Sequence, residues 1–156
     1  MSELTIEANT SVYIFKDSNG FQYTKDSESA TPIYNTDWPV TITNNGNSKL
    51  TVTFEDGITF TSSTHYFICG SNNIQFGDDN KTTINLDGIT NGYPGLIQNG
   101  YDDGVNNENG KRNITIKNLD IKGKNGTTIA SYGGGVAQAY FGRGNSSGSI
   151  SIDGCS

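Results

Sequence analysis

Charged side chains are scarce in this chain, and basic ones most of all. Of its 156 residues 17% are charged, with 10 lysines and arginines against 16 aspartates and glutamates, so the formal net charge is −6. Binding to nucleic acid depends on basic side chains that neutralise phosphates. The composition therefore excludes a basic nucleic-acid surface, and the modest net charge argues against a disordered polyelectrolyte.

Cysteine is nearly absent. The chain has two cysteines, which are too few for a disulfide framework. Neither is part of a Cys-x-x-Cys pair, so metal or redox chemistry at sulfur is not expected. A single Cys69–Cys155 bridge remains open beside the favoured interpretation, in which both are buried free thiols acting as small apolar residues.

Long apolar runs are also missing. No stretch approaches the roughly 18 apolar residues that span a bilayer, so no membrane insertion is expected. The first ten residues lack the basic and apolar regions of a secretory signal, so no signal peptide is expected in this sequence.

Small and turn-forming residues dominate what is present. Glycine occurs 20 times, asparagine 19, threonine 18 and serine 15, together nearly half of the chain, and they are poor helix formers. The apolar residues are mainly isoleucine, with 16 copies against five leucines and five alanines. Because β-branched residues suit a pleated surface, the composition predicts an all-β protein.

A short phrase returns along the chain. From Phe54 to Leu86 is 32 residues, and the next two intervals are 33 residues each. The four copies are Phe54-Glu55-Asp56-Gly57-Ile58, Leu86-Asp87-Gly88-Ile89, Leu119-Asp120-Ile121 and Ile152-Asp153-Gly154-Cys155. If each repeat is one turn of a coil, equivalent strands lie parallel, about 4.8 Å apart, with the four phrase-initial residues in one inner column. This predicts a parallel β-helix, a solenoid, over a sandwich or an up-and-down barrel.

The two ends depart from the repeat. Residues 1–40 are expected to form an N-terminal cap with a hairpin around Asn19-Gly20, and residues 41–156 the coils. The chain stops where a new repeat has just begun. We therefore expect either a fragment of a longer solenoid or an end covered by another copy, as a homo-oligomer or an end-to-end assembly.

Several phrases resemble known proteins. Strands that end in Asn or Asp with Gly, and paired isoleucines such as Ile114-Thr115-Ile116, resemble the pectin-lyase-like right-handed parallel β-helix superfamily. More particular stretches are similar to β-helical repeat proteins of large DNA viruses, with relatives on microbial surfaces: residues 39–44, 66–71, 93–100 and 133–142. The resemblance implies the fold and a place on a virion or extracellular surface, but no settled activity.

Enzymatic chemistry is weakly supported. Asn35-Thr36-Asp37 and Asp102-Asp103 superficially resemble elements of polygalacturonases, but no His-Gly follows Asp103 and no Arg-Ile-Lys is present. Lys111, Arg112 and Lys117 match the base of a polysaccharide lyase in composition only, and an outer-face role is favoured. No catalytic residue is assigned. A lyase or hydrolase whose site lies partly outside this sequence remains the alternative.

Metal and cofactor sites are not predicted. The loop 101–110 is rich in oxygen ligands but lacks the spacing of a calcium loop, so an insertion between strands is favoured. His65, the one histidine, is expected to be a structural residue rather than a general base. Asn73, Asn113 and Asn118 are expected to stack between coils in amide ladders.

Together these observations favour a non-enzymatic structural solenoid of a virion or surface fibre. We expect two kinds of partner for such a solenoid: further copies of the same chain, through self-association, and a polysaccharide, through carbohydrate binding along one β-face. We expect four tyrosines to stack on sugars: Tyr93, Tyr101, Tyr132 and Tyr140. Ice binding through Thr41-Ile42-Thr43 and Thr51-Val52-Thr53 is a weaker hypothesis, because later repeats carry Asn, Gln and Ser at such positions.

Overall fold

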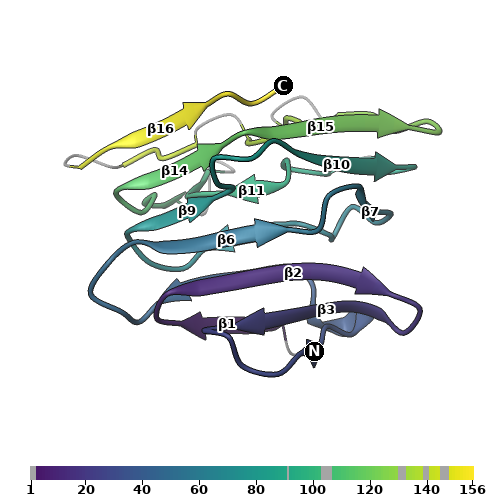
Figure 1. The fold of residues 1–156 in the computed structure, drawn as a ribbon. Coiled ribbons are helices and arrows are strands. Elements are labelled where there is room, and N and C mark those ends of the chain that lie inside the picture. Colours follow the sequence, from purple (N-terminus) through teal and green to yellow (C-terminus); the bar gives the residue numbers. More distant parts are fainter. Residues whose placement is uncertain (1–2, 91, 103–106, 130–132, 139–140, 145–147) are drawn as a thin grey trace.

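Nearly all of the regular secondary structure in the described residues is β-strand. The computed structural model describes residues 3–90, 92–102, 107–129, 133–138, 141–144 and 148–156 (Figure 1). Within these ranges the only helical element is the short 3-10 helix η1 (Asn35–Asp37). The prediction of an all-β protein is confirmed.

Three sheets hold most of the strands. Sheet A contains, in spatial order, β1 (Thr5–Ala8), β5 (Val40–Asn44), β8 (Phe67–Cys69) and β11 (Ile97–Gln98). Sheet B contains β16 (Ile150–Asp153), β14 (Ile114–Lys117), β9 (Ile74–Phe76), β6 (Leu50–Phe54), β2 (Ser11–Asp17), β3 (Gly20–Lys25) and β4 (Thr31–Pro32). Sheet C contains β15 (Leu119–Lys124), β10 (Thr82–Asp87) and β7 (Ile58–Phe60), and β12 (Tyr101–Asp102) pairs separately with β13 (Asn107–Glu108).

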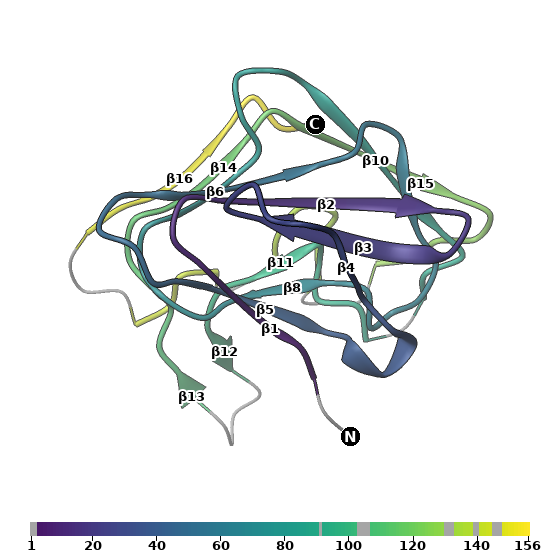
Figure 2. The ribbon, with the colours of Figure 1, turned by 60° about the horizontal axis from the view of Figure 1, so that its bottom comes forward.

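The chain visits the sheets in a fixed order. From β5 it passes to β6 and β7, then to β8, β9 and β10, and from β11 to β14 and β15, always from A to B to C (Figure 2). Pairing between successive visits is parallel in each sheet. Antiparallel pairing in the described residues is confined to β2–β3, β3–β4 and β12–β13.

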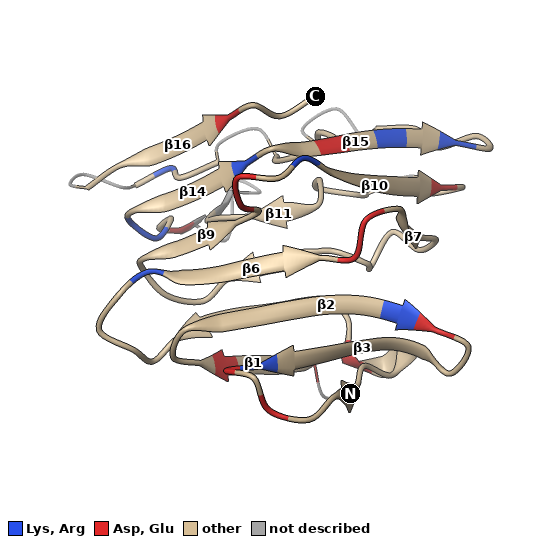
Figure 3. Cartoon of the chain, in the orientation of Figure 1, with Lys and Arg blue, Asp and Glu red and all other residues tan. Residues whose placement is uncertain are grey.

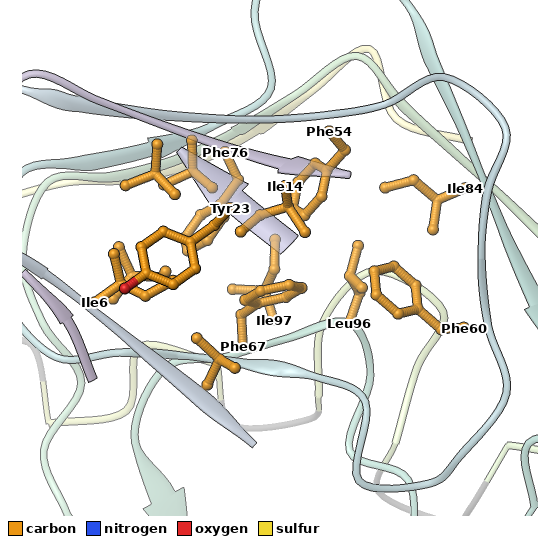
Figure 4. Close-up of a cluster of buried hydrophobic side chains, with 14 of the residues drawn as sticks. Ile6, Ile14, Tyr23, Phe54, Phe60, Phe67, Phe76, Ile84, Leu96 and Ile97 are labelled. Carbon is orange, nitrogen blue, oxygen red and sulfur yellow. The ribbon is translucent and has the colours of Figure 1, made fainter. Parts of the chain in front are cut away.

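Aliphatic side chains align in inner columns across these strands. One column of sheet B runs through Leu50, Ile74, Ile114 and Ile150, and the next through Val12, Val52, Phe76, Ile116 and Ile152. Alternate residues of a strand point to opposite sides, so the row between these two columns faces outward, and its members from Ser11 to Ser151 are polar. Figure 4 shows side chains from several strands converging on the same interior.

The register predicted from the repeated phrase is wrong. Phe54 lies opposite Ile14 in sheet B, Leu86 opposite Phe60 in sheet C, and Leu119 opposite Thr82. Ile152 pairs with Ile116, so the four phrase-initial residues do not share a column. Register follows the burial of alternate residues, and turns of unequal length absorb the difference. Registered partners are consequently 24 residues apart from Leu50 to Ile74 but 40 apart from Ile74 to Ile114.

The first strands join the parallel sheets. β1 pairs parallel with β5, and β2 pairs parallel with β6, so the change in pairing does not fall at residue 40. The predicted hairpin is present: β2 and β3 are antiparallel, with Asp17 opposite Gly20. The turn itself is Ser18-Asn19, and Gly20, whose φ of +109° suits glycine, starts the return strand.

Aromatic side chains close the core beneath this hairpin. Phe21 on β3 stacks on Phe60 at 5.3 Å between ring centroids and meets Trp38 edge-on, also at 5.3 Å. Trp38, which follows η1, also contacts Phe67. Phe60 belongs to β7 and Phe67 to β8, so β3 and the segment after η1 cover the buried side chains of these two strands. Such pairs contribute about 0.5–1.5 kcal/mol each beyond the area that they bury.

Asp26 ties the turn between β1 and β2 to the end of β3. Its carboxylate accepts hydrogen bonds from the backbone N–H groups of Asn9, Thr10 and Ser11 and from the Thr10 hydroxyl, at 2.7–3.1 Å for the shortest bond from each. Partial burial raises the pKa of the Asp26 carboxyl, but these hydrogen bonds outweigh it and hold the pKa far below its ordinary value.

We expect Asp26→Asn to destabilise the fold by about 1–2 kcal/mol at neutral pH, because an amide is a weaker acceptor than a carboxylate. A carboxyl with a lowered folded-state pKa stabilises above its unfolded pKa, near 3.9, and this contribution is lost as pH falls below that value. Urea titrations of both proteins at pH 7 and at pH 2.5 measure the difference. A difference that persists undiminished at pH 2.5 would contradict the assignment.

Candidate functional site

Of the four tyrosines predicted to bind sugars, only Tyr93 has its side chain among the described residues. Tyr93 is fully buried, and its hydroxyl donates to the His65 carbonyl at 3.4 Å, so its prediction as an exposed sugar platform is wrong. Burial raises the pKa of its hydroxyl, with Tyr66 contributing. Tyr132, Tyr140 and the side chain of Tyr101 lie outside the described residues.

His65 is a structural residue. Its ring packs between Phe21 at 5.0 Å and Trp38 at 4.8 Å, and its Nδ1 accepts the backbone N–H groups of Thr61 and Ser62. A nitrogen that accepts cannot carry a proton, so the imidazole is neutral. Burial lowers the pKa of His65 to about 4, and the nearby Lys16 ammonium adds to the effect. The expected structural role fits this geometry.

This histidine predicts a pH dependence of stability. Because its pKa is about 4 when folded and near 6.5 when unfolded, the unfolded chain binds more protons between these values, and stability falls as pH drops through this window. The full loss is about 2–3 kcal/mol. Denaturant titrations at pH 7 and pH 4.5 measure it. His65→Asn, which keeps an acceptor near the Nδ1 position, should remove this component, and an unchanged pH slope in that variant would contradict the account.

Asparagines join neighbouring strand ends. The Asn113 side-chain amide donates to the Asn73 side-chain oxygen at 3.0 Å, and Ser149 N–H donates to the Asn113 oxygen at 3.1 Å. Asn73 and Asn113 have φ of +62° and +57°, a left-handed conformation that asparagine tolerates. The predicted ladder is therefore confirmed for this pair. Asn118 instead donates to the Asp78 carbonyl, at 2.7 Å.

Residues considered for catalysis or metal binding are engaged locally or are dispersed. The Asp37 carboxylate accepts the backbone N–H of Tyr34 at 2.7 Å, which closes the turn of η1. Lys117 forms an ion pair with Asp79. In the loop 101–110, β12 and β13 pair antiparallel. Among the described residues, no three His, Cys, Asp or Glu side chains are grouped to hold a metal ion.

The cysteines are free. Cys69 is buried and Cys155 half-buried, so the alternative of a bridge between them is wrong. Burial raises the pKa of the Cys69 thiol, more than Lys111 lowers it, which keeps the thiol protonated and inert.

The threonine pairs considered for ice binding lie on different sheets. Thr41 and Thr43 belong to sheet A, whereas Thr51 and Thr53 belong to sheet B. The outward neighbours of Thr51 in its own sheet are Ser11 and Gln75, so no regular threonine array forms there. The ice-binding hypothesis loses its geometric basis.

The two ends of the sheets differ. At one end the core is closed by buried side chains of the hairpin and its following segment, including Phe21, Ile33 and Trp38. At the other, β16 has β14 as its only partner among the described strands, and Ile152 is 51% exposed although it continues a fully buried column. An apolar strand edge of this kind favours pairing with a further strand.

Comparisons with protein-family models, with curated proteins and with solved structures found no match to this chain. No helix of the described ranges is long and apolar enough to cross a bilayer. The chemistry of the described surface therefore carries the functional argument.

Proposed function

We propose that the chain is a right-handed parallel β-helix that serves as a rigid, non-enzymatic structural element of a virion or surface assembly. The fixed order of visits to sheets A, B and C, with parallel register between visits, supports the coiled architecture. Stacked inner columns make each turn of the coil depend on its neighbours, as in other repeat proteins.

Self-association through β16 is part of this proposal. The single observation that carries it is the exposure of Ile152. This side chain is half exposed at the end of a column whose other members, among them Val52, Phe76 and Ile116, are buried. A second copy is the proposed occupant because the strand is self-complementary. Antiparallel pairing centred on Ser151 places Ile150 of one copy opposite Ile152 of the other, on the same face.

The opposite edge of sheet B is not equivalent to β16. β4 consists of Thr31 and Pro32, and proline has no N–H to donate to a further strand. Head-to-tail growth through sheet B would require both of its edges to be open. Pairing of two β16 edges gives a closed two-fold dimer instead.

Sedimentation over a wide range of protein concentration tests this proposal. The expected result is a monomer–dimer equilibrium that Ile152→Lys shifts to monomer, because a lysine on the inner face of the joint would be desolvated. Tyr34→Lys, at a 65% exposed residue near the closed end, is the matched control and should leave the equilibrium unchanged. A monomer at every concentration, or equal effects of the two variants, would overturn the self-association.

A further inference from the structure

Two aromatic side chains stand on the outer face of β2. Val12 and Ile14 point into the core and are buried, so Tyr13 and Phe15 between and after them point outward. Their ring centroids are 5.5 Å apart with an interplanar angle of 18°. Tyr13 is 39% exposed and Phe15 is half-buried, so part of this aromatic pair is open to solvent.

Polar side chains of the adjacent strands border the pair. On β3, Thr24 lies opposite Tyr13 and Gln22 opposite Phe15, while Thr53 on β6 lies opposite Tyr13 from the other side. Glu55 follows β6 and accepts the backbone N–H of Lys16 at 3.2 Å. These groups supply hydroxyls, an amide and a carboxylate around the two rings.

The rest of the same outer face is polar, and two lysines lie on it at β14: the Lys49 ammonium donates to the Thr115 hydroxyl at 2.7 Å, and Lys117 stands opposite Asp153. One outward row crosses five strands and consists of Ser11, Thr51, Gln75, Thr115 and Ser151. In Figure 3 most of β2, β6 and β9 carries no charge, and the charged residues of β2 gather at its end. The two lysine charges lie at β14, three strands from β2, whereas the Glu55 carboxylate borders the Tyr13–Phe15 pair, so the pair favours an uncharged ligand over an acidic one.

We propose that the Tyr13–Phe15 pair and its polar border form a binding site for a neutral polysaccharide. A pyranose ring has an apolar face that packs on an aromatic ring, and equatorial hydroxyls that exchange hydrogen bonds with groups such as Gln22, Thr24 and Glu55. In the outward row beside the pair, Ser11, Thr51 and Gln75 provide two further hydroxyls and one amide along which an extended chain can continue. This site is independent of the proposed joint at β16.

The choice of a neutral glycan over a nucleic acid follows from charge. Stacking on aromatic rings also occurs in single-stranded nucleic-acid sites, but there it accompanies a positively charged groove. Here the neighbouring charges include Glu55 and Asp17, and the latter is hydrogen-bonded to Gln22. A phosphate chain would be repelled, whereas carboxylates accept hydrogen bonds from sugar hydroxyls.

Isothermal titration with cellohexaose and chitohexaose, and with oligogalacturonate as the acidic probe, tests the proposal. We expect weak binding of at least one neutral probe, in the millimolar to micromolar range, and none of the acidic one. Tyr13→Thr and Phe15→Thr are expected to weaken binding at least tenfold. Threonine suits the strand, as at the neighbouring Thr53, and far-ultraviolet circular dichroism establishes that each variant remains folded.

Tyr34→Thr is the matched control, because Tyr34 is 65% exposed but lies outside sheet B. It should bind as the unaltered protein does. In addition, amide resonances of β2, β3 and β6 should shift on titration with the neutral probe. Absence of binding by both neutral probes, an equal loss in Tyr34→Thr, or shifts confined to other strands would overturn the site. None of these results bears on the dimer.

Discussion

Gly77→Ala is expected to destabilise the protein by about 3–5 kcal/mol, since it combines overpacking with backbone strain. Gly77 follows β9, has φ of +89°, and donates its N–H to the Val52 carbonyl at 2.7 Å. A Cβ at this position would lie 1.9 Å from the Lys117 carbonyl oxygen on β14. Neither backbone can retreat without breaking the pairing of β9 with its neighbours. Urea denaturation followed by circular dichroism measures the loss.

Gly57→Ala is the control for this variant. Gly57 has a similar φ of +81°, but a Cβ there would meet no atom within 4 Å. It should therefore cost only the left-handed strain, about 1–2 kcal/mol. Equal losses in the two alanine variants would show that β9 and β14 are not in contact at Gly77.

Ile116→Ala is expected to destabilise the fold by about 3–4 kcal/mol through the cavity it leaves. Ile116 is fully buried and lies between Phe76 and Ile152 in one column, so no solvent can fill the space and only part of the surroundings can relax. Denaturant titration at low protein concentration isolates this monomer term.

Ile152→Ala removes the same atoms from the next position of that column and is the matched comparison. Because Ile152 is 51% exposed, its truncation should cost the monomer less than about 1 kcal/mol. Its effect should grow with protein concentration if two β16 strands pair, since the joint then buries this side chain. Identical losses at Ile116 and Ile152 in the monomer would contradict the open end described for sheet B.

Composition was sufficient to predict the class of the fold but not its register. Sixteen isoleucines and many turn-forming residues predicted β-structure, and the alternation in Asn113-Ile114-Thr115-Ile116 correctly indicated a strand with one buried face. The recurring phrase misled because its members fall in different sheets: Leu86 is in sheet C and Ile152 in sheet B. Turn lengths decide which strands meet, and they are set by tertiary packing that a repeat count does not reveal.

The interaction surface was harder to predict, although part of its signal was present. Residue type alone indicates Tyr93 as a sugar-stacking ring, but its surroundings bury it. The pattern Ser11-Val12-Tyr13-Ile14-Phe15 already implied that, with Val12 and Ile14 inward, two aromatic rings face outward. The polar groups that border those rings come from β3 and β6, and only the pairing of the strands brings them together.

The most direct test of the stacked parallel arrangement is a nuclear Overhauser measurement on Ile116. The account predicts contacts from its methyl groups to the Phe76 ring on one side and to the Ile152 methyls on the other, since the three are registered partners in sheet B. Contacts among Phe54, Leu86 and Leu119 in place of these would contradict the register, and an Ile116 that touches neither Phe76 nor Ile152 would contradict the parallel stack itself.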